Sequence, residues 1–390
     1  MFSKRTDWKL TPNRFTMAQR EIQASGTKLL DLTASNPTRV GLRYDAESIL
    51  SALAAPESLD YDPQARGLLS ARQAVAHYYR EQHDVYDVDP ENIILTTSTS
   101  EGYSYLFRLL CNSEDEVLVP KPSYPLFDFL ADLQDVKLVP YPLIYDHGWQ
   151  IDFPSLYKAV THRTRALVLV HPNNPTGSYV HIEEAPTLNS FCREYNLSLI
   201  VDEVFLDYPH DGAYRNSFVS NREALTFTLS GLSKISGLPQ MKVSWLAVSG
   251  AHEQVEPAMT WLDVIADTFL SMNAPIQAAL PALLEQRKTV QPVLLDRLRA
   301  NLEELDRQLA KHPSVKRLDV EGGWSAALRV PVTQSDEELA IEIMKKCSVL
   351  VHPGHFYDFP TDGYLIVSLI TPVAEFREGI RRALEVISDS

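Results

Sequence analysis

The feature that most constrains the fold is a series of short, nearly continuous apolar runs through the middle of this 390-residue chain. They lie at 116–120, 136–140, 166–170, 197–201, 225–229 and 243–249, and a further strand is expected at 93–99, where it enters a polar turn. Runs of this kind are typical of strands that are covered on both faces, as in a parallel sheet. Segments compatible with helices lie between several of them, at 69–82, 101–110 and 186–195. The alternation predicts an α/β domain with helical crossover connections.

The pattern changes after about residue 275, where a smaller α+β unit is expected. A long helical region spans roughly 275–311 and is interrupted at Pro292, and short strands follow near 315–320 and 325–330. Ser335 and Glu338 have the spacing of a capping box, which predicts a helix that extends through Lys346. Strands near 348–352 and 364–369 and a helix at 373–388 complete the unit, whereas the first 45 residues show no strong period.

Composition excludes several classes of function. The chain has 36 Lys and Arg against 51 Asp and Glu, a formal charge of −15, which argues against general binding to nucleic acid or anionic membranes. No stretch approaches the length needed to span a bilayer, and the N-terminal residues contain no apolar run like that of a signal peptide. Three widely spaced cysteines fit buried thiols in a reducing compartment, and the 11 histidines show no metal-ligand spacing. We therefore expect a cytoplasmic protein without a metal site.

Three segments carry polar residues that point to chemistry. Lys234 follows the apolar run 225–229 in the sequence SGLSK, at a strand end where α/β sheets bind ligands. Asn174 precedes Pro175 in HPNNPTG, and Asp202 ends the run at 197–201 in the sequence DEVF. Taken singly, each residue has an ordinary explanation: a surface lysine, a turn residue and a strand-end cap.

In this order and at these spacings, the segments resemble the class I/II family of fold-type I aminotransferases, which use pyridoxal phosphate (PLP). Tyr61 and Gly67 in LDYDPQARGLLSAR, STSEG at 98–102 and PSY at 122–124 extend the resemblance over nearly the whole chain. It implies a large three-layer α/β/α PLP-binding domain over 46–285 with a mostly parallel sheet. A smaller, discontinuous α+β domain would be built from 1–45 and 286–390, and the protein would form a homodimer.

The resemblance implies a role for each polar residue. Lys234 would form the Schiff base with the cofactor aldehyde and later move protons as general base and acid. Asp202 would pair with the protonated pyridine nitrogen, Asn174 would donate to the ring oxygen, and Tyr124 would stack on the ring.

The cofactor phosphate would be held at the start of a helix. Ser98, Thr99 and Ser100 supply backbone N–H groups and hydroxyls there, although the same residues also suit a plain N-cap. By resemblance, Ser233, Lys242 and Tyr61 from a second subunit would complete the phosphate site.

The sequence departs from the family pattern at three positions. Lys242 stands where an arginine is usual, which removes the bidentate fork, and Phe205 replaces a common tyrosine and so removes a phenol donor. Ile366 occupies the arginine position of the C-terminal Arg-x-Ser signature, and an isoleucine cannot bind a substrate α-carboxylate. Either another cation takes this role or the substrate has no α-carboxylate at that place.

Several residues are candidates for contact with the substrate. Arg39 and Arg43 lie in the N-terminal turn that covers the site in relatives, together with Asn36. Trp324, His355 and Phe356 fall in loops that border the substrate in relatives, although packing explains each of them equally well.

The function indicated is PLP-dependent transfer of an amino group from a donor, in the first instance an amino acid, to an oxo acid by a ping-pong route. A PLP-dependent lyase or decarboxylase is the first alternative, because Lys234, Asp202 and Asn174 would serve those reactions equally well. A non-catalytic PLP-binding regulator is the second alternative, and the acidic composition argues against it.

Overall fold

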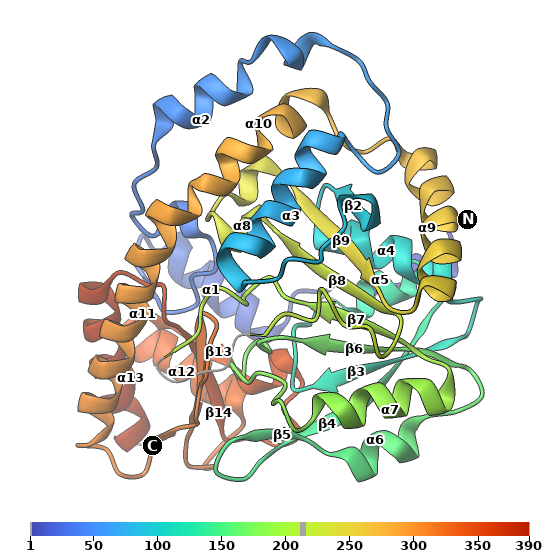
Figure 1. The fold of residues 1–390 in the computed structure, drawn as a ribbon. Helices are drawn as coiled ribbons and strands as arrows, with labels where there is room; N and C mark the ends of the chain where they lie inside the picture. Colours follow the sequence, from blue (N-terminus) through green and yellow to red (C-terminus); the bar gives the residue numbers. More distant parts are fainter. Residues whose placement is uncertain (1, 126, 211–215, 390) are drawn as a thin grey trace.

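A computed structural model describes residues 2–125, 127–210 and 216–389, and a mixed eight-stranded sheet lies at its centre (Figure 1). The strand order is β2-β9-β8-β7-β6-β3-β4-β5. In chain order the strands are β2 (Ile93–Thr96), β3 (Glu116–Lys121), β4 (Lys137–Tyr145), β5 (Trp149–Ile151), β6 (Thr164–Val170), β7 (Ser198–Asp202), β8 (Thr226–Gly231) and β9 (Ser244–Ser249). Strand β9 is antiparallel to both of its neighbours and β5 is antiparallel to β4, while the other pairs are parallel.

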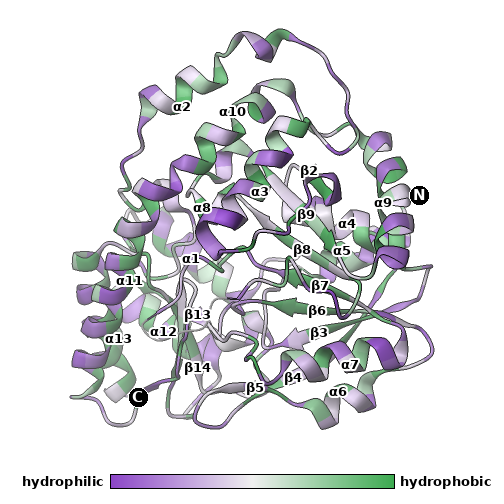
Figure 2. Cartoon of the chain, in the orientation of Figure 1, coloured by the Kyte–Doolittle hydropathy of each residue, from purple (hydrophilic) through white to green (hydrophobic). Residues whose placement is uncertain are grey.

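Helices cover both faces of this sheet. Ala166, Val168 and Val170 of β6 contribute to one hydrophobic cluster, while Leu167 and Leu169 contribute to another on the opposite face. The first cluster includes α4 (Thr99–Leu110), α5 (Phe127–Asp132) and α9 (His252–Phe269). The opposite face is covered by α6 (Phe153–Ala159) and α7 (Ala185–Tyr195), and by α3 (Leu69–His83) and α10 (Ala274–Glu285) farther along. Strands β6, β7 and β8 are accordingly buried over nearly their whole length, and hydrophobic residues predominate in β6 and β7 (Figure 2). The expected three-layer α/β/α architecture is confirmed.

A second, antiparallel sheet has the order β10-β11-β14-β13, with bounds β10 (Lys316–Arg317), β11 (Ser325–Arg329), β13 (His352–Pro353) and β14 (Tyr364–Ser368). Its core includes residues of α11 (Arg287–Leu309), α12 (Asp336–Cys347) and α13 (Val373–Asp389). The N-terminal part of the chain packs here as well, because β1 (Leu30–Asp31) pairs in parallel with β12 (Val349–Leu350) and α1 (Arg14–Ala24) contacts α12.

The remaining elements are short. Helix α2 (Ala46–Leu53) packs on α10, and α8 (Leu232–Ile235) follows β8 directly. The described residues also form 3₁₀ helices at η1 (Lys4–Thr6), η2 (Pro37–Arg39), η3 (Pro56–Leu59), η4 (Pro90–Asn92), η5 (Pro239–Met241) and η6 (Gly354–Tyr357). Among the residues described, no helix combines the length and the apolar character that a membrane span requires.

Two expectations about helices were wrong. The long helical region breaks at Gln286, between α10 and α11, and not at Pro292. Pro292 lies in the second turn of α11, where its missing N–H removes one hydrogen bond without ending the helix. Helix α1 was not expected, because only Phe15 and Ala18 of its residues are buried and its apolar face is correspondingly weak. The predicted cap at Ser335 is present, since its Oγ accepts a hydrogen bond from the Glu338 N–H at the start of α12.

Candidate active site

Lys234 lies in α8, in the loop that follows the carboxyl end of β8. Gly231 ends that strand in such close contact with β9 that a Cβ would lie 2.8 Å from the Val243 carbonyl oxygen. The Lys234 Nζ lies 3.4 Å from the Ser35 carbonyl oxygen and near two aromatic faces, 4.7 Å from the ring centroid of Trp324 and 5.4 Å from that of Phe205. Burial lowers the pKa of Lys234 from 10.5 to about 8, against the opposing attraction of Asp202. A substantial fraction of this amine is therefore neutral and nucleophilic near physiological pH.

Asp202 ends the neighbouring strand β7 and is only 9% exposed. The Tyr103 hydroxyl donates to its Oδ2 at 3.3 Å, and the Val204 N–H donates to its Oδ1 at 3.2 Å. Burial raises the pKa of Asp202 to about 6, although these two hydrogen bonds and Lys234 favour the charged form. A buried carboxylate with so few partners is well suited to bind a cationic ring nitrogen.

A cavity of about 190 Å³ adjoins the lysine. It brings together four residues predicted from the sequence, Tyr124, Asn174, Trp324 and Phe356. Ile366 also lines it, as do Thr33, Ala34, Ser35, Pro125, Phe205, Ser325, His352, Tyr357 and Ser368. Within the described ranges, no arginine or lysine lines this cavity. Its walls are therefore mostly aromatic, aliphatic and hydroxylic.

The start of α4 provides neutral donors for an anion. The Ser98 Oγ caps this helix by accepting from the Glu101 N–H at 3.2 Å, so the helix begins at Thr99, two residues before the expected start. In the part of the chain that is described, the hydroxyls of Thr99, Ser100 and Ser233 form no hydrogen bond within the protein. Free hydroxyls at a helix N-terminus, such as those of Thr99 and Ser100, form a favourable environment for a phosphate.

Lys242 follows η5 in the left-handed conformation, with φ of 53°. Its side chain is exposed and makes no ion pair with any residue described. Its charge is therefore not neutralised by a neighbouring carboxylate within the described chain.

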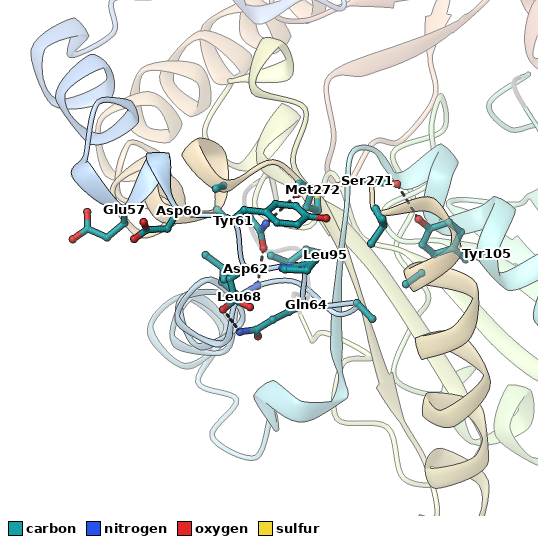
Figure 3. A pocket seen from close by; sticks show the side chains of 16 residues that line it. Glu57, Asp60, Tyr61, Asp62, Gln64, Leu68, Leu95, Tyr105, Ser271 and Met272 are labelled. Atoms are coloured by element: carbon teal, nitrogen blue, oxygen red, sulfur yellow. Dashed lines mark hydrogen bonds between the residues drawn. The ribbon is translucent and has the colours of Figure 1, made fainter.

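Other predicted residues lie outside the cavity. Asn36 caps η2 by accepting from the Thr38 N–H at 3.0 Å, and Arg39 at the end of η2 is exposed. Both lie on the same turn as Ser35, whose carbonyl contacts Lys234. Tyr61 is 81% exposed and borders a separate cavity, which is lined by residues within 57–68 and 270–277 together with Leu95, Tyr105 and Ala266 (Figure 3).

Sequence reasoning missed three residues that contact the catalytic candidates: Ser35, Tyr103 and Tyr208. The Tyr208 hydroxyl donates to the Lys234 carbonyl oxygen at 2.6 Å. All three contacts join residues that are far apart in the sequence, and they therefore leave no local signal.

Comparisons with known proteins identify the family of this chain. Residues 27–381 match the family described as aminotransferase class I and II. The glutamate-pyruvate aminotransferase AlaA of Haemophilus influenzae is 25% identical over 94% of this chain and 93% of its own length. The alanine aminotransferase of Mycobacterium tuberculosis is 28% identical over 88% of this chain and 82% of its own. Among solved structures, the alanine aminotransferase from Pyrococcus furiosus superimposes with a TM-score of 0.90 at 22% identity, with 100% of both chains covered.

The fold and the family match define a PLP-dependent enzyme. The chain belongs to the class I and II aminotransferase family, and it is accordingly a PLP-dependent aminotransferase. The donor set fits this cofactor: an amine of lowered pKa for its aldehyde, the sparsely bonded Asp202 for its ring nitrogen, and free hydroxyls at the start of α4 for its phosphate.

Proposed function

We propose that Lys234 and Asp202 are the catalytic residues of this aminotransferase, and that Asn174, Tyr124 and Ser98–Ser100 hold its cofactor together with Ser233, Lys242 and Tyr61. The observation that carries the proposal is the position of the Lys234 amine, which lies beside the cavity with its pKa lowered to about 8. Bound PLP supplies an aldehyde that receives amines and a ring that accepts electrons. Lys234 would hold that aldehyde and, once released, would carry a proton at its Nζ between the substrate carbon and the cofactor carbon. Asp202 would keep the ring nitrogen protonated.

The walls of the cavity would orient the reacting groups. Asn174 has a free amide nitrogen within the described chain, and its Oδ1 accepts from the Ser325 Oγ at 3.4 Å, so the side chain is directed by a neighbouring strand. Phe205 and Trp324 would keep water away from the amine. On the proposed division of the chain into 46–285 and 1–45 with 286–390, Lys234 and Trp324 come from different domains, and the site lies between them.

We propose an amino acid donor and an oxo acid acceptor, in line with the alanine and glutamate-pyruvate aminotransferases named above. Ile366 is 2% exposed and lines the cavity, so no cation is available on that wall for a carboxylate. Arg39 is proposed to fill this role, because it follows Ser35 on a turn that already contacts Lys234, and within the described residues its guanidinium has no ion-pair partner.

Borohydride trapping and a donor screen test the proposal together. Reduction of the protein loaded with PLP should leave the cofactor on the peptide that contains Lys234, and Lys234→Ala should carry none. Without an acceptor, each enzyme molecule should convert about one molecule of donor into its oxo acid. Catalytic turnover of a donor under these conditions would indicate a lyase instead.

A matched pair of variants tests the carboxylate site. Arg39→Gln should lower kcat/KM for alanine between about 10- and 150-fold, the usual value of a charge-assisted hydrogen bond, while Arg43→Gln on the same exposed segment should change it little. An equal effect of the two variants would contradict the role of Arg39.

We further propose a cytoplasmic homodimer in which Tyr61 reaches the partner's phosphate site. Exposed apolar side chains accompany Tyr61: Leu59, two residues earlier in the chain, is 91% exposed, and Leu270, which lines the same cavity, is 56% exposed. Exposed apolar groups of this kind favour association. Cytoplasmic location is proposed because all three cysteines are free thiols.

Subunit mixing tests the shared site. Tyr61→Ala and Lys234→Ala are each expected to have little activity. A mixture refolded together should regain about a quarter of the wild-type activity, because mixed dimers contain one complete site. No recovery, with dimers present by sedimentation, would place Tyr61 outside the partner's site.

A further inference from the structure

The helix that carries Lys234 is held by side chains from elsewhere in the fold. Helix α8 has four residues, which leaves most of its carbonyl groups without an intrahelical partner. The Lys234 carbonyl accepts from the Tyr208 hydroxyl at 2.6 Å, the Ile235 carbonyl from the Gln291 amide at 2.9 Å, and the Gly237 carbonyl from the Tyr44 hydroxyl at 2.6 Å. The main chain beside the amine is therefore fixed by residues that are distant in sequence.

Tyr208 also contacts the wall against which the Lys234 amine lies. Its ring packs edge to face on Trp324, with centroids 5.1 Å apart, and its own carbonyl accepts from the Gly323 N–H at 2.8 Å. The Lys234 Nζ lies over that same indole. Tyr208 is fully buried, and burial raises the pKa of its hydroxyl, so the group stays protonated and remains a donor. One side chain thus holds the backbone of Lys234 and supports the surface beside its amine.

The preceding residue anchors this arrangement. Asp207 is buried and accepts from the Tyr78 hydroxyl at 2.9 Å and from the Gln291 amide at 2.5 Å, and its Oδ1 lies 2.9 Å from the His83 Nε2. The same Gln291 amide reaches the Ile235 carbonyl. Residues 207 and 208, which follow the strand that ends in Asp202, are therefore connected to the carbonyls of residues 235 and 234.

We propose that Tyr208 is a positioning residue for catalysis, which fixes Lys234 relative to Trp324 and thereby sets the geometry and reactivity of the lysine amine. The inference rests on the proposed role of Lys234. Small displacements of a reacting group are costly, since an error of about 1 Å can lower a rate about 100-fold. Loss of the Tyr208 hydroxyl should therefore be felt in the reactivity of Lys234 and in kcat more than in KM.

Two conservative variants separate positioning from stability. Tyr208→Phe removes only the hydroxyl. Tyr141→Phe is the control, because the Tyr141 hydroxyl is likewise buried and donates to a main-chain carbonyl, that of Val168, at 2.8 Å. Gln291→Met, which removes the donor to the Ile235 carbonyl, provides a second test of the same arrangement. For each cofactor-free protein, the rate of PLP attachment is followed by absorbance, and the attachment site is identified by borohydride trapping and peptide mass.

We expect attachment at Lys234 in all four proteins, with a rate about 10- to 100-fold lower for Tyr208→Phe and unchanged for Tyr141→Phe. The pH midpoint of the bound cofactor's absorbance should shift in Tyr208→Phe and stay unchanged in Tyr141→Phe. Equal attachment rates and midpoints in Tyr208→Phe and Tyr141→Phe would overturn the positioning role while leaving the proposed function intact. Trapping at a residue other than Lys234 in the wild type would overturn both.

Discussion

The Lys234 amine should titrate near pH 8 in the cofactor-free protein. Burial lowers its pKa from 10.5 to about 8. At pH 7.5 about a quarter of the amines would then be neutral, against about 0.1% for an ordinary lysine. Selective modification with a limiting amine-reactive reagent, followed by peptide mass analysis over a pH series, measures this midpoint directly. A midpoint at or above pH 10 would refute the lowered pKa of the Lys234 amine.

The charge of Asp202 affects the pKa of Lys234 in the direction opposite to burial. It raises that pKa, whereas the larger effect of burial lowers it. Asp202→Asn preserves the size of the side chain but removes the charge, and the midpoint of Lys234 should therefore move further below 8. An upward shift would mean that Asp202 does not act on the amine through its charge.

The lowered pKa of Lys234 also makes the stability of the fold depend on pH. The folded state disfavours the protonated amine, so the unfolded chain binds more protons between pH 8 and 10.5, and the stability contributed by Lys234 rises with pH across that window. From the shift of 10.5 to about 8, the change is up to about 3 kcal/mol. The free energy of unfolding is measured by urea denaturation at pH 7 and pH 10, for the cofactor-free wild type and for Lys234→Met. The difference between the two proteins isolates the contribution of Lys234, because the other titrating groups are common to both. Parallel pH dependence in the two proteins would refute the reasoning.

Four single substitutions should each change a measurable property of the protein. Ile366→Arg should raise kcat/KM for α-amino acids relative to the corresponding amines, because an arginine on this cavity wall can bind a carboxylate. Steady-state kinetics with both substrate classes measure the change, and Ile366→Met is the control. Phe205→Tyr should lower the pH midpoint of the bound cofactor's absorbance, because a phenol stabilises the anionic ring oxygen; a spectrophotometric titration that gives an equal or higher midpoint would contradict it. Lys242→Arg should retain PLP more tightly on dialysis, because the guanidinium binds phosphate with two donors. Gly177→Ala should destabilise the fold by more than about 1 kcal/mol in chemical denaturation, because φ is +71° and the new Cβ would lie 2.5 Å from the Gly322 carbonyl oxygen.

The large sheet was predictable because its signal is local. Each of the apolar runs that suggested strands became a strand of the eight-stranded sheet, and Lys234 and Asp202 follow or end two of them. The weaker elements were not predictable in the same way. Helix α1 buries two residues, and its position is determined by contact with α12, more than three hundred residues later. No local pattern reports such a contact.

The residues of the candidate site also differ in whether the sequence could predict them. Residues that directly follow strands, such as Asn174 and Lys234, could be named from the sequence, because strand ends converge on one edge of the sheet. The contacts of Ser35, Tyr103 and Tyr208 depend on how distant segments pack. Their residue types are ordinary, and only the distances to Lys234 and Asp202 distinguish them.

Ile366 illustrates why a residue that is known from the sequence still needs its surroundings. Its identity excludes one cationic partner for a substrate carboxylate, but the consequence depends on the rest of the cavity wall. Within the described residues that wall offers no arginine or lysine, and burial lowers the pKa of His352, the histidine that lines it, which favours the neutral form. Bringing a carboxylate into such surroundings without a cation costs several kcal/mol. We therefore propose that an α-carboxylate is recognised by a group that reaches the cavity from its rim, and that Arg39 supplies it, because Arg39 lies on the turn that begins at Ser35, the residue in contact with Lys234.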